Sequence, residues 1–210
     1  MTNHRLRPSH FALALALSGA LLAFSASAAP EPSTPAAEMV AVSDAAYPKS
    51  ASVAGETLEL NGAGLRKILF IEVYAAALYV PSPASDPAQI MAEEGPRRVA
   101  LTLMRDVSGE DFIEALEEGL NDNLTPEKKA AIEKDIESLK AIMTAIGDVK
   151  KGDAVDFDYA PDTGTTVRRN GELVGSPIAG KALYDAVLAI WLGDKPIDGG
   201  LKKSLLGPVR

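Results

Sequence analysis

The side chains most often used for nucleophilic, acid–base and metal chemistry are scarce in this sequence of 210 residues. It has no cysteine, and its only histidines are His4 and His10. If the N-terminal segment is removed, as argued next, the remaining chain has neither residue type. This excludes Ser-His-Asp and Cys-His catalytic sites, Cys/His zinc sites, disulfides, and haem ligation by thiolate or imidazole. The remaining polar groups are arginine, lysine, tyrosine, carboxylates and hydroxyls, so we expect no metal and no cofactor.

Residues 1–28 have the pattern of a secretory signal peptide. A basic start (His4-Arg5-Leu6-Arg7) precedes an apolar run over 11–24, which ends at the small-residue site Ala26-Ser27-Ala28. A helix over that run would span about 21 Å, which is short of a bilayer core of about 30 Å. We therefore predict cleavage near Ala28-Ala29 and secretion of the mature chain to the periplasm.

The charge of the chain argues against a polyanionic partner. The sequence has 29 acidic and 21 basic residues, and residues 1–28 remove Arg5 and Arg7 but no acid. The mature chain then has 19 basic residues and a net charge of −10, whereas nucleic acid needs a basic footprint. No later segment approaches 18 consecutive apolar residues, so no membrane span is expected after cleavage.

The order of compositions along the chain predicts one domain preceded by a tether. Residues 29–52 are rich in alanine, proline and serine and are interpreted as a flexible linker. Residues 53–210 are expected to form the domain. Within it, 53–60 is a predicted strand, Asn61-Gly62-Ala63-Gly64 a glycine-rich turn, and 68–80 a second strand with both faces covered.

Helices are expected mainly in the middle of the domain. A short helix over 86–94 and a strand over 98–104 precede a helix capped by Ser108. A second helix starts at Thr125-Pro126-Glu127 and ends at Gly147. Its apolar residues recur every three or four positions and form one buried stripe: Ile132, Ile136, Leu139, Met143 and Ile146.

The last part of the chain returns to strands and ends in helices. Alternation over 154–160 and 165–169, with turns at Asp162-Thr163-Gly164 and Asn170-Gly171, predicts a meander of hairpins. A long helix is expected from about Ile178, followed by a short helix around 201–206. Antiparallel strands with grouped helices indicate an α+β fold, in which a helical layer covers a sheet.

Three stretches in this order resemble the chalcone isomerase-like superfamily, in particular its short bacterial exported members. They are Asn61–Lys67 running on to Val73–Tyr79, then Leu103–Ser108, and finally Ile190–Pro196 with Leu201–Lys203. The resemblance implies an open-faced β-sandwich: a large antiparallel sheet, a helical layer, and a ligand cleft between them. Members of that superfamily include plant isomerases that close chalcones into flavanones, non-catalytic fatty-acid-binding proteins, and some haem-binding relatives.

The same resemblance implies two ligand-binding residues. Arg66 matches the family's site arginine, and Tyr74 matches the tyrosine that holds the ligand carboxylate with it in the fatty-acid-binding branch. A guanidinium fork and a hydroxyl are suited to bind a carboxylate or a phenolate. The site tyrosine of the isomerases corresponds to Phe112 here, and a later asparagine corresponds to Gly119, which argues against chalcone cyclisation.

Spacing leaves a question about this pair. Eight residues of straight strand would separate Arg66 from Tyr74 by about 26 Å, so they can share a ligand only if the chain bends between them. Arg66 has an alternative role as an ion-pair partner of Glu72, which has the same strand parity. Tyr74 is alternatively a core tyrosine with a satisfied hydroxyl group.

Three further residues are candidates for the ligand site. Strand parity allows Thr102 to face the cleft, and Arg105 could line its mouth. An alternative for Arg105 is a solvent-facing ion pair with Asp106. Phe112 is expected in the cleft wall or in the core.

These residues support three functional hypotheses. The first is a periplasmic binding protein for a small apolar or aromatic anion, such as a fatty acid. The second is an isomerase acting on a chalcone-like aromatic enone, with Arg66 stabilising a phenolate or enolate. The third is a haem carrier, for which only tyrosine or methionine could act as ligand. The oligomeric state and the identity of the ligand are left open.

Overall fold

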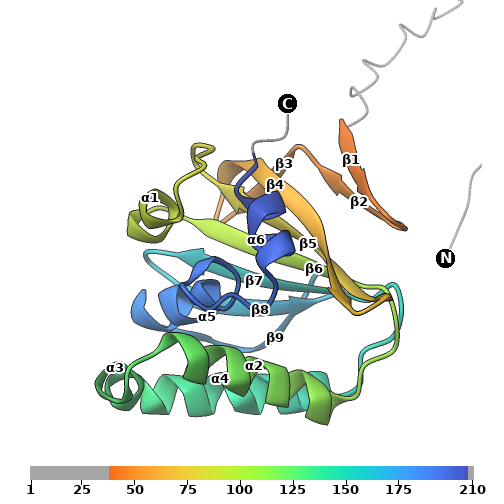
Figure 1. Cartoon of the computed structure of the whole chain (residues 1–210). Coiled ribbons are helices and arrows are strands. Elements are labelled where there is room, and N and C mark those ends of the chain that lie inside the picture. The colour runs from red at the N-terminus through yellow and green to blue at the C-terminus, as the bar shows by residue number, and fades with distance from the viewer. Residues whose placement is uncertain (1–37, 208–210) are drawn as a thin grey trace, which may run out of the picture. The chain divides into compact units, whose positions relative to one another are not determined.

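A seven-stranded antiparallel sheet forms the centre of the structure, a computed structural model that describes residues 38–207 (Figure 1). Its strands neighbour one another in chain order, so every connection joins adjacent strands. The strands are β3 (Ser50–Val53), β4 (Glu56–Ile68), β5 (Ile71–Val80), β6 (Arg97–Leu103), β7 (Ala154–Ala160), β8 (Gly164–Arg169) and β9 (Glu172–Ile178). The predicted signal peptide, residues 1–28, lies outside the described residues.

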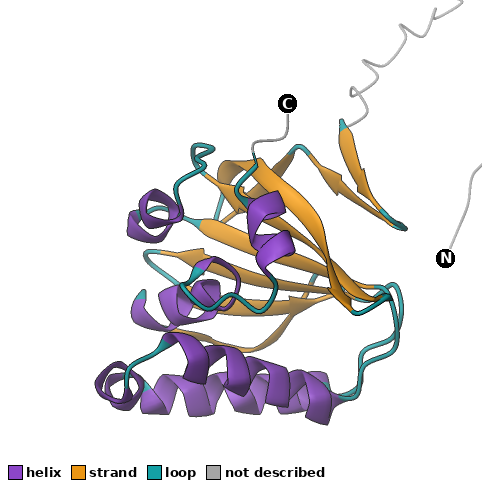
Figure 2. Ribbon diagram, viewed as in Figure 1, coloured by secondary structure: helices purple, strands orange, loops and turns teal. Residues whose placement is uncertain are grey.

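Helices cover one face of this sheet (Figure 2). They are α1 (Pro87–Ala92), α2 (Gly109–Asn123), α3 (Pro126–Ala131), α4 (Glu133–Ile146), α5 (Ala182–Leu192) and α6 (Gly199–Leu205). The predicted caps are present, because Ser108 accepts from the backbone N–H of Asp111 and Thr125 from that of Lys128. The single helix predicted from Thr125 to Gly147 is instead two helices that meet at Ile132.

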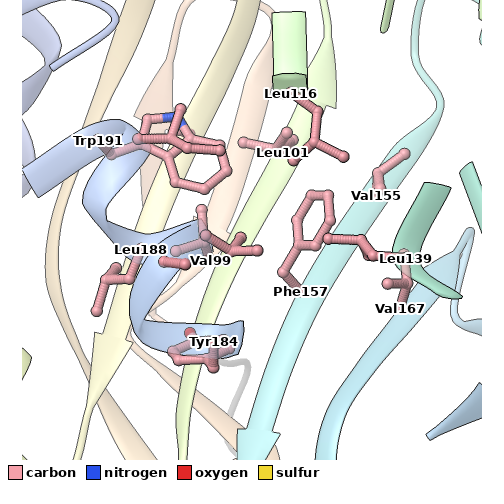
Figure 3. Close-up of a cluster of buried hydrophobic side chains, with 14 of the residues drawn as sticks. Val99, Leu101, Leu116, Leu139, Val155, Phe157, Val167, Tyr184, Leu188 and Trp191 are labelled. Carbon is pink, nitrogen blue, oxygen red and sulfur yellow. The ribbon is translucent and has the colours of Figure 1, made fainter. Parts of the chain in front are cut away.

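The main core lies between the helices and the sheet. Alternate residues of β6, β7 and β8, among them Leu101, Phe157 and Val167, meet the predicted α4 stripe and α5 (Figure 3). Helix α5 starts at Ala182, later than predicted, because Ile178 is the last residue of β9. The α+β architecture expected from the pattern of elements is confirmed.

The opposite face of the sheet is covered in part by a hairpin of β1 (Met39–Val42) and β2 (Ala45–Pro48). Ala45 and Tyr47 are buried in a second apolar cluster with Leu58, Ala77 and Tyr79. The predicted linker over 29–52 is therefore wrong for 38–52, which form β1, β2 and β3, while 29–37 lie outside the described residues. Alanine and serine resemble a linker in composition, but here they alternate with residues that pack against the sheet.

The segment Asn61-Gly62-Ala63-Gly64, predicted as a turn, lies inside β4. The register with β5 shifts between Leu60 and Gly62, so Asn61 forms a β-bulge. Its buried amide donates to the Leu205 carbonyl (2.7 Å) and accepts from the Ala84 N–H (2.7 Å). The bulge exchanges the two faces of the strand. Leu58 and Leu60 face the second cluster. After the bulge the even-numbered residues Gly62, Gly64 and Arg66 face the helices instead, and Ala63 and Leu65 pack against the second cluster.

Gly62 and Gly64 allow helix α6 to lie directly on β4. A Cβ atom on Gly62 would collide with backbone carbonyl oxygens at the C-terminal end of α6, and one on Gly64 would collide with Ser204. Neither glycine requires a positive φ, since both lie in regular strand conformation. Turn geometry was therefore the wrong explanation for these glycines, and close packing of a helix is the right one.

A half-buried carboxyl group on the second face, that of Asp156, predicts a pH-dependent stability. Burial raises the pKa of Asp156 to about 6, and Arg98 only partly opposes this. An unfolded aspartate titrates near 3.9, so the unfolded state loses its proton first as pH rises. The free energy of unfolding should therefore fall between about pH 4 and pH 6 by about 3 kcal/mol, and this loss should persist at higher pH.

Asp156→Asn should remove this dependence. We expect the variant to be more stable than the parent at pH 7 and to lose the advantage at pH 4, as measured by urea unfolding at both values. The exposed Glu172→Gln exchange on β9 is the matched control and should not change the difference between the two pH values. An Asp156→Asn variant whose advantage does not depend on pH would contradict the expectation.

Candidate functional site

A cavity of about 230 Å³ lies between the sheet and the helices. Its wall is mainly apolar and combines Val73, Leu101, Leu103 and Phe157 from the sheet with Phe112, Leu116, Met143, Ile190 and Trp191 from the helices. Four of these side chains, Leu101, Leu116, Phe157 and Trp191, are seen together in Figure 3. The exposed lining residues mark the mouth: Ile68, Arg105, Asp106 and Asp111.

Arg66 and Tyr74 both line this cavity, and they are directly opposite each other in the β4–β5 ladder. The chain turns between them at Leu69-Phe70, so no straight strand separates the two residues. The strand predicted over 68–80 therefore begins only at Ile71. The bend that a shared ligand requires is present, and the bulge at Asn61 directs Arg66 to the helix-covered face.

The Tyr74 hydroxyl is positioned by Trp191. The indole Nε1–H of Trp191 donates to the Tyr74 oxygen at 2.9 Å, and the Arg66 guanidinium lies 5.6 Å from the centre of the tyrosine ring. Burial raises the pKa of Tyr74, and the charge of Arg66 opposes this effect without cancelling it. The phenol is therefore neutral at pH 7. It serves as a hydrogen-bond donor to an oxyanion rather than as a base.

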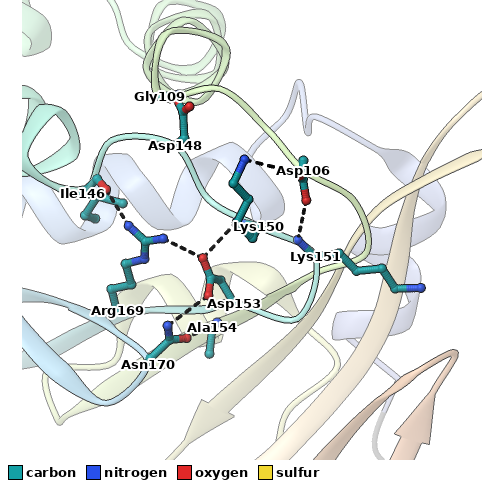
Figure 4. Close-up of polar contacts among 10 residues, drawn as sticks. All are labelled: Asp106, Gly109, Ile146, Asp148, Lys150, Lys151, Asp153, Ala154, Arg169 and Asn170. Atoms are coloured by element: carbon teal, nitrogen blue, oxygen red, sulfur yellow. Dashed lines mark hydrogen bonds and ion pairs between the residues drawn. The ribbon is translucent and has the colours of Figure 1, made fainter.

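The alternative partners suggested for Arg66 and Arg105 are bound elsewhere. Glu72 pairs with Lys67 at 3.1 Å and accepts from the Ser43 hydroxyl at 2.8 Å. Asp106 pairs with Lys150 at 3.2 Å and accepts from the Lys151 N–H at 2.9 Å, as Figure 4 shows. These hydrogen bonds lower the pKa of Asp106.

Both arginines consequently lack an acidic partner within the described part of the chain. Within residues 38–207 no carboxylate oxygen lies within 4.0 Å of the Arg66 or Arg105 side-chain nitrogens. Among the described residues, the Arg105 side chain donates only to the Asp106 carbonyl oxygen, at 3.3 Å. The arrangement can therefore receive an anionic group at the mouth while an apolar body occupies the cavity.

Thr102 lies on the other face of the sheet, so its predicted place in the site is wrong. Its neighbours Leu101 and Leu103 line the cavity, and alternation turns the Thr102 side chain away from it. There its hydroxyl accepts from the Tyr47 hydroxyl at 3.1 Å. Parity alone could not assign the face, because both faces of this sheet are covered. Phe112 does line the cavity, from α2.

The sequence predicted a strand for Phe157 and a helix for Trp191, but not the place of either residue in the cavity wall. Both are nearly fully buried, and both line the cavity. Gly119 helps to place Trp191, because it lets α5, the helix that carries Trp191, lie close to α2. A Cβ atom at position 119 would meet Ile190 Cγ2 at 2.8 Å and push α5 away. No local signal identifies such residues, since a cavity wall and a packed core have the same composition.

Within residues 38–207, no cluster of three or more His, Cys, Asp or Glu side chains is arranged to hold a metal ion. None of the described helices is long and apolar enough to cross a membrane.

Comparison with known proteins agrees with the architecture. Residues 39–207 match the chalcone isomerase-like family. Among solved structures, the chain is similar to a fatty-acid binding protein of Arabidopsis thaliana, with a TM-score of 0.61 and 17% sequence identity over 80% of this chain and 96% of that chain. No curated protein sequence matches it. Because the family match covers most of the chain and the fold agrees with it, this protein belongs to the chalcone isomerase-like family.

Proposed function

We propose that this protein is a non-catalytic binding protein for a small apolar anion, such as a fatty acid or an aromatic acid. The observation that carries the proposal is the pairing of Arg66 with Tyr74 in the wall of an apolar cavity. Arg66 has no acidic partner among the described residues, and Tyr74 accepts a hydrogen bond from Trp191, which leaves its own proton to donate. A carboxylate placed here would receive two or three charge-assisted hydrogen bonds.

The volume of the cavity favours a short ligand. A water molecule takes about 30 Å³ in the liquid, and a methylene group is of similar size. A cavity of about 230 Å³ then holds roughly eight such groups. Acids with eight to ten carbons, or one aromatic ring with a short side chain, would fill it. Longer chains would require the walls to move.

The family supports binding more than catalysis. The solved structure reported above is that of a fatty-acid binding protein, and its fold is shared. Phe112 offers no hydroxyl at the place where the resemblance puts the isomerase tyrosine, and Gly119 offers no amide. The neutral Tyr74 phenol could stabilise an enolate but would not take up a proton.

Export is part of the proposal. Its support is the signal-peptide pattern over residues 1–28, which would place the protein in the periplasm after cleavage near Ala28-Ala29. A location outside the inner membrane would bring the cavity into contact with acids released from envelope lipids or entering from outside. The mature chain would then meet such ligands in water or at a membrane surface.

Two measurements test the proposal. Native mass spectrometry of protein from the periplasmic fraction should give a chain that starts at Ala29 and carries an acid. Titration with octanoate and decanoate should change the fluorescence of Trp191, the only tryptophan in the chain. Methyl decanoate, which lacks the charge, should bind at least about tenfold more weakly. Equal affinity for acid and ester, or turnover of a chalcone above background, would overturn the proposal.

A further inference from the structure

The turn between β4 and β5 exposes four consecutive large apolar side chains. Ile68 and Ile71 are about half exposed, and Leu69 and Phe70 are 86% and 97% exposed. Turns of this kind normally carry asparagine, aspartate or glycine, because two-residue hairpins need a positive φ. Leu69 adopts this left-handed conformation, which most side chains avoid, with a φ of 55°. Neither Leu69 nor Phe70 belongs to an apolar cluster of the described structure.

The hairpin tip, residues Ile68–Ile71, is continuous with the cavity. Ile68 belongs to the tip and also lines the mouth, where Arg66 and Arg105 lie. An apolar ligand leaving the cavity would therefore pass along an apolar edge. The tip is an extension of the binding surface into solvent.

Most of the charges around the tip are paired with one another, and two guanidiniums are the exception. Lys67, Lys150 and Lys151 neutralise Glu72, Asp106 and Asp44 in ion pairs. The guanidiniums of Arg66 and Arg105 have no acidic partner within the described residues. Two carboxylates lie nearby, Asp111 at the mouth and Asp198, which accepts from the Lys67 N–H at 3.4 Å. The Arg66 and Arg105 guanidiniums are thus available to contact anionic headgroups at this end of the sheet.

We propose that the hairpin tip inserts Leu69 and Phe70 into a lipid bilayer that contains anionic headgroups, which Arg66 and Arg105 contact. Docked in this way, the cavity mouth opens toward the acyl chains, and the acid ligand enters without crossing bulk water. This rests on the proposed function, because it supplies the source of that ligand. Apolar insertion combined with a few basic groups is the usual chemistry of reversible membrane docking.

The test uses vesicles of phosphatidylcholine, alone or mixed with phosphatidylglycerol, and the protein as purified from its host with its N-terminus established by mass. The parent should float with the mixed vesicles, and high salt should weaken this binding. Leu69→Ser/Phe70→Ser should reduce the partition coefficient at least about tenfold. Leu173→Ser, at a half-exposed leucine of β9, is the matched control and should bind like the parent.

A second readout separates this proposal from the proposed function. Decanoate in solution should change Trp191 fluorescence equally in the parent and in the double variant, because Leu69 and Phe70 do not line the cavity. The transfer of a fatty acid from vesicles to the protein should be slower for the double variant than for the parent. Equal vesicle binding by both proteins, or none by the parent, would overturn the inference. So would light scattering that shows a parent dimer and a monomeric double variant, since the tip would then contact a second copy.

Discussion

Replacing Arg66 by methionine is expected to weaken the binding of decanoate by about 10- to 150-fold. The reason is that a charge-assisted hydrogen bond in such a site contributes about 1.5–3 kcal/mol, and methionine keeps the length and apolar stem of the side chain without the charge. Tyr74 and Trp191 remain in place, so the cavity itself should be intact. The affinity is measured by titrating Trp191 fluorescence.

Two comparisons make the result specific to the charge. Lys67→Met changes the adjacent residue, whose side chain pairs with Glu72 away from the cavity, and should leave the affinity unchanged. Methyl decanoate should bind Arg66→Met about as well as it binds the parent. An equal loss for ester and acid would indicate a damaged cavity. An unchanged affinity for the acid would remove Arg66 as the anion-binding residue.

The largest expected effect on stability is that of Gly62→Ala. The added Cβ atom would collide with carbonyl oxygens of α6, and these are backbone atoms that cannot rotate away. Helix α6 would have to move off β4 and would strain the Asn61 hydrogen bond to the Leu205 carbonyl. We expect a loss of about 2–3 kcal/mol in the free energy of unfolding. This corresponds to a decrease in Tm of roughly 4–12 °C for a domain of this size.

Gly199→Ala is the matched control, because a Cβ atom at that position has open space around it. It lies in the first turn of the same helix and should be neutral or slightly stabilising. Thermal unfolding followed by circular dichroism measures both variants. If Gly62→Ala unfolds at the same temperature as the parent, α6 does not pack on β4 as described.

Features that depend on neighbouring residues could be predicted from the sequence. Ser108 and Thr125 cap their helices because a side-chain oxygen reaches an N–H two or three residues ahead. The hairpin at Asn170-Gly171 follows from residues that tolerate positive φ. The apolar stripe of α4 follows from helical periodicity. Each of these signals is complete within a short window of the chain.

Features that depend on distant residues could not be predicted in this way. Asn61-Gly62-Ala63-Gly64 has the composition of a turn, but its conformation is determined by α6, more than 130 residues later. The linker prediction failed for the same reason, since Ala45 and Tyr47 are buried only by packing against a sheet whose strands come later in the chain. The side of the sheet that Thr102 faces depends on which layer covers each face.

The sequence by itself determined which chemically functional side chains are available. Residues 38–207 contain neither histidine nor cysteine, and they do contain arginines and tyrosines that can bind an anion. Only the tertiary structure decided that Arg66 meets Tyr74, that Trp191 positions the tyrosine, and that both lie over an apolar cavity. The physical reason is register. A turn at Leu69-Phe70 and a bulge at Asn61 select the partner and the face of each residue, and contacts with distant helices stabilise that bulge.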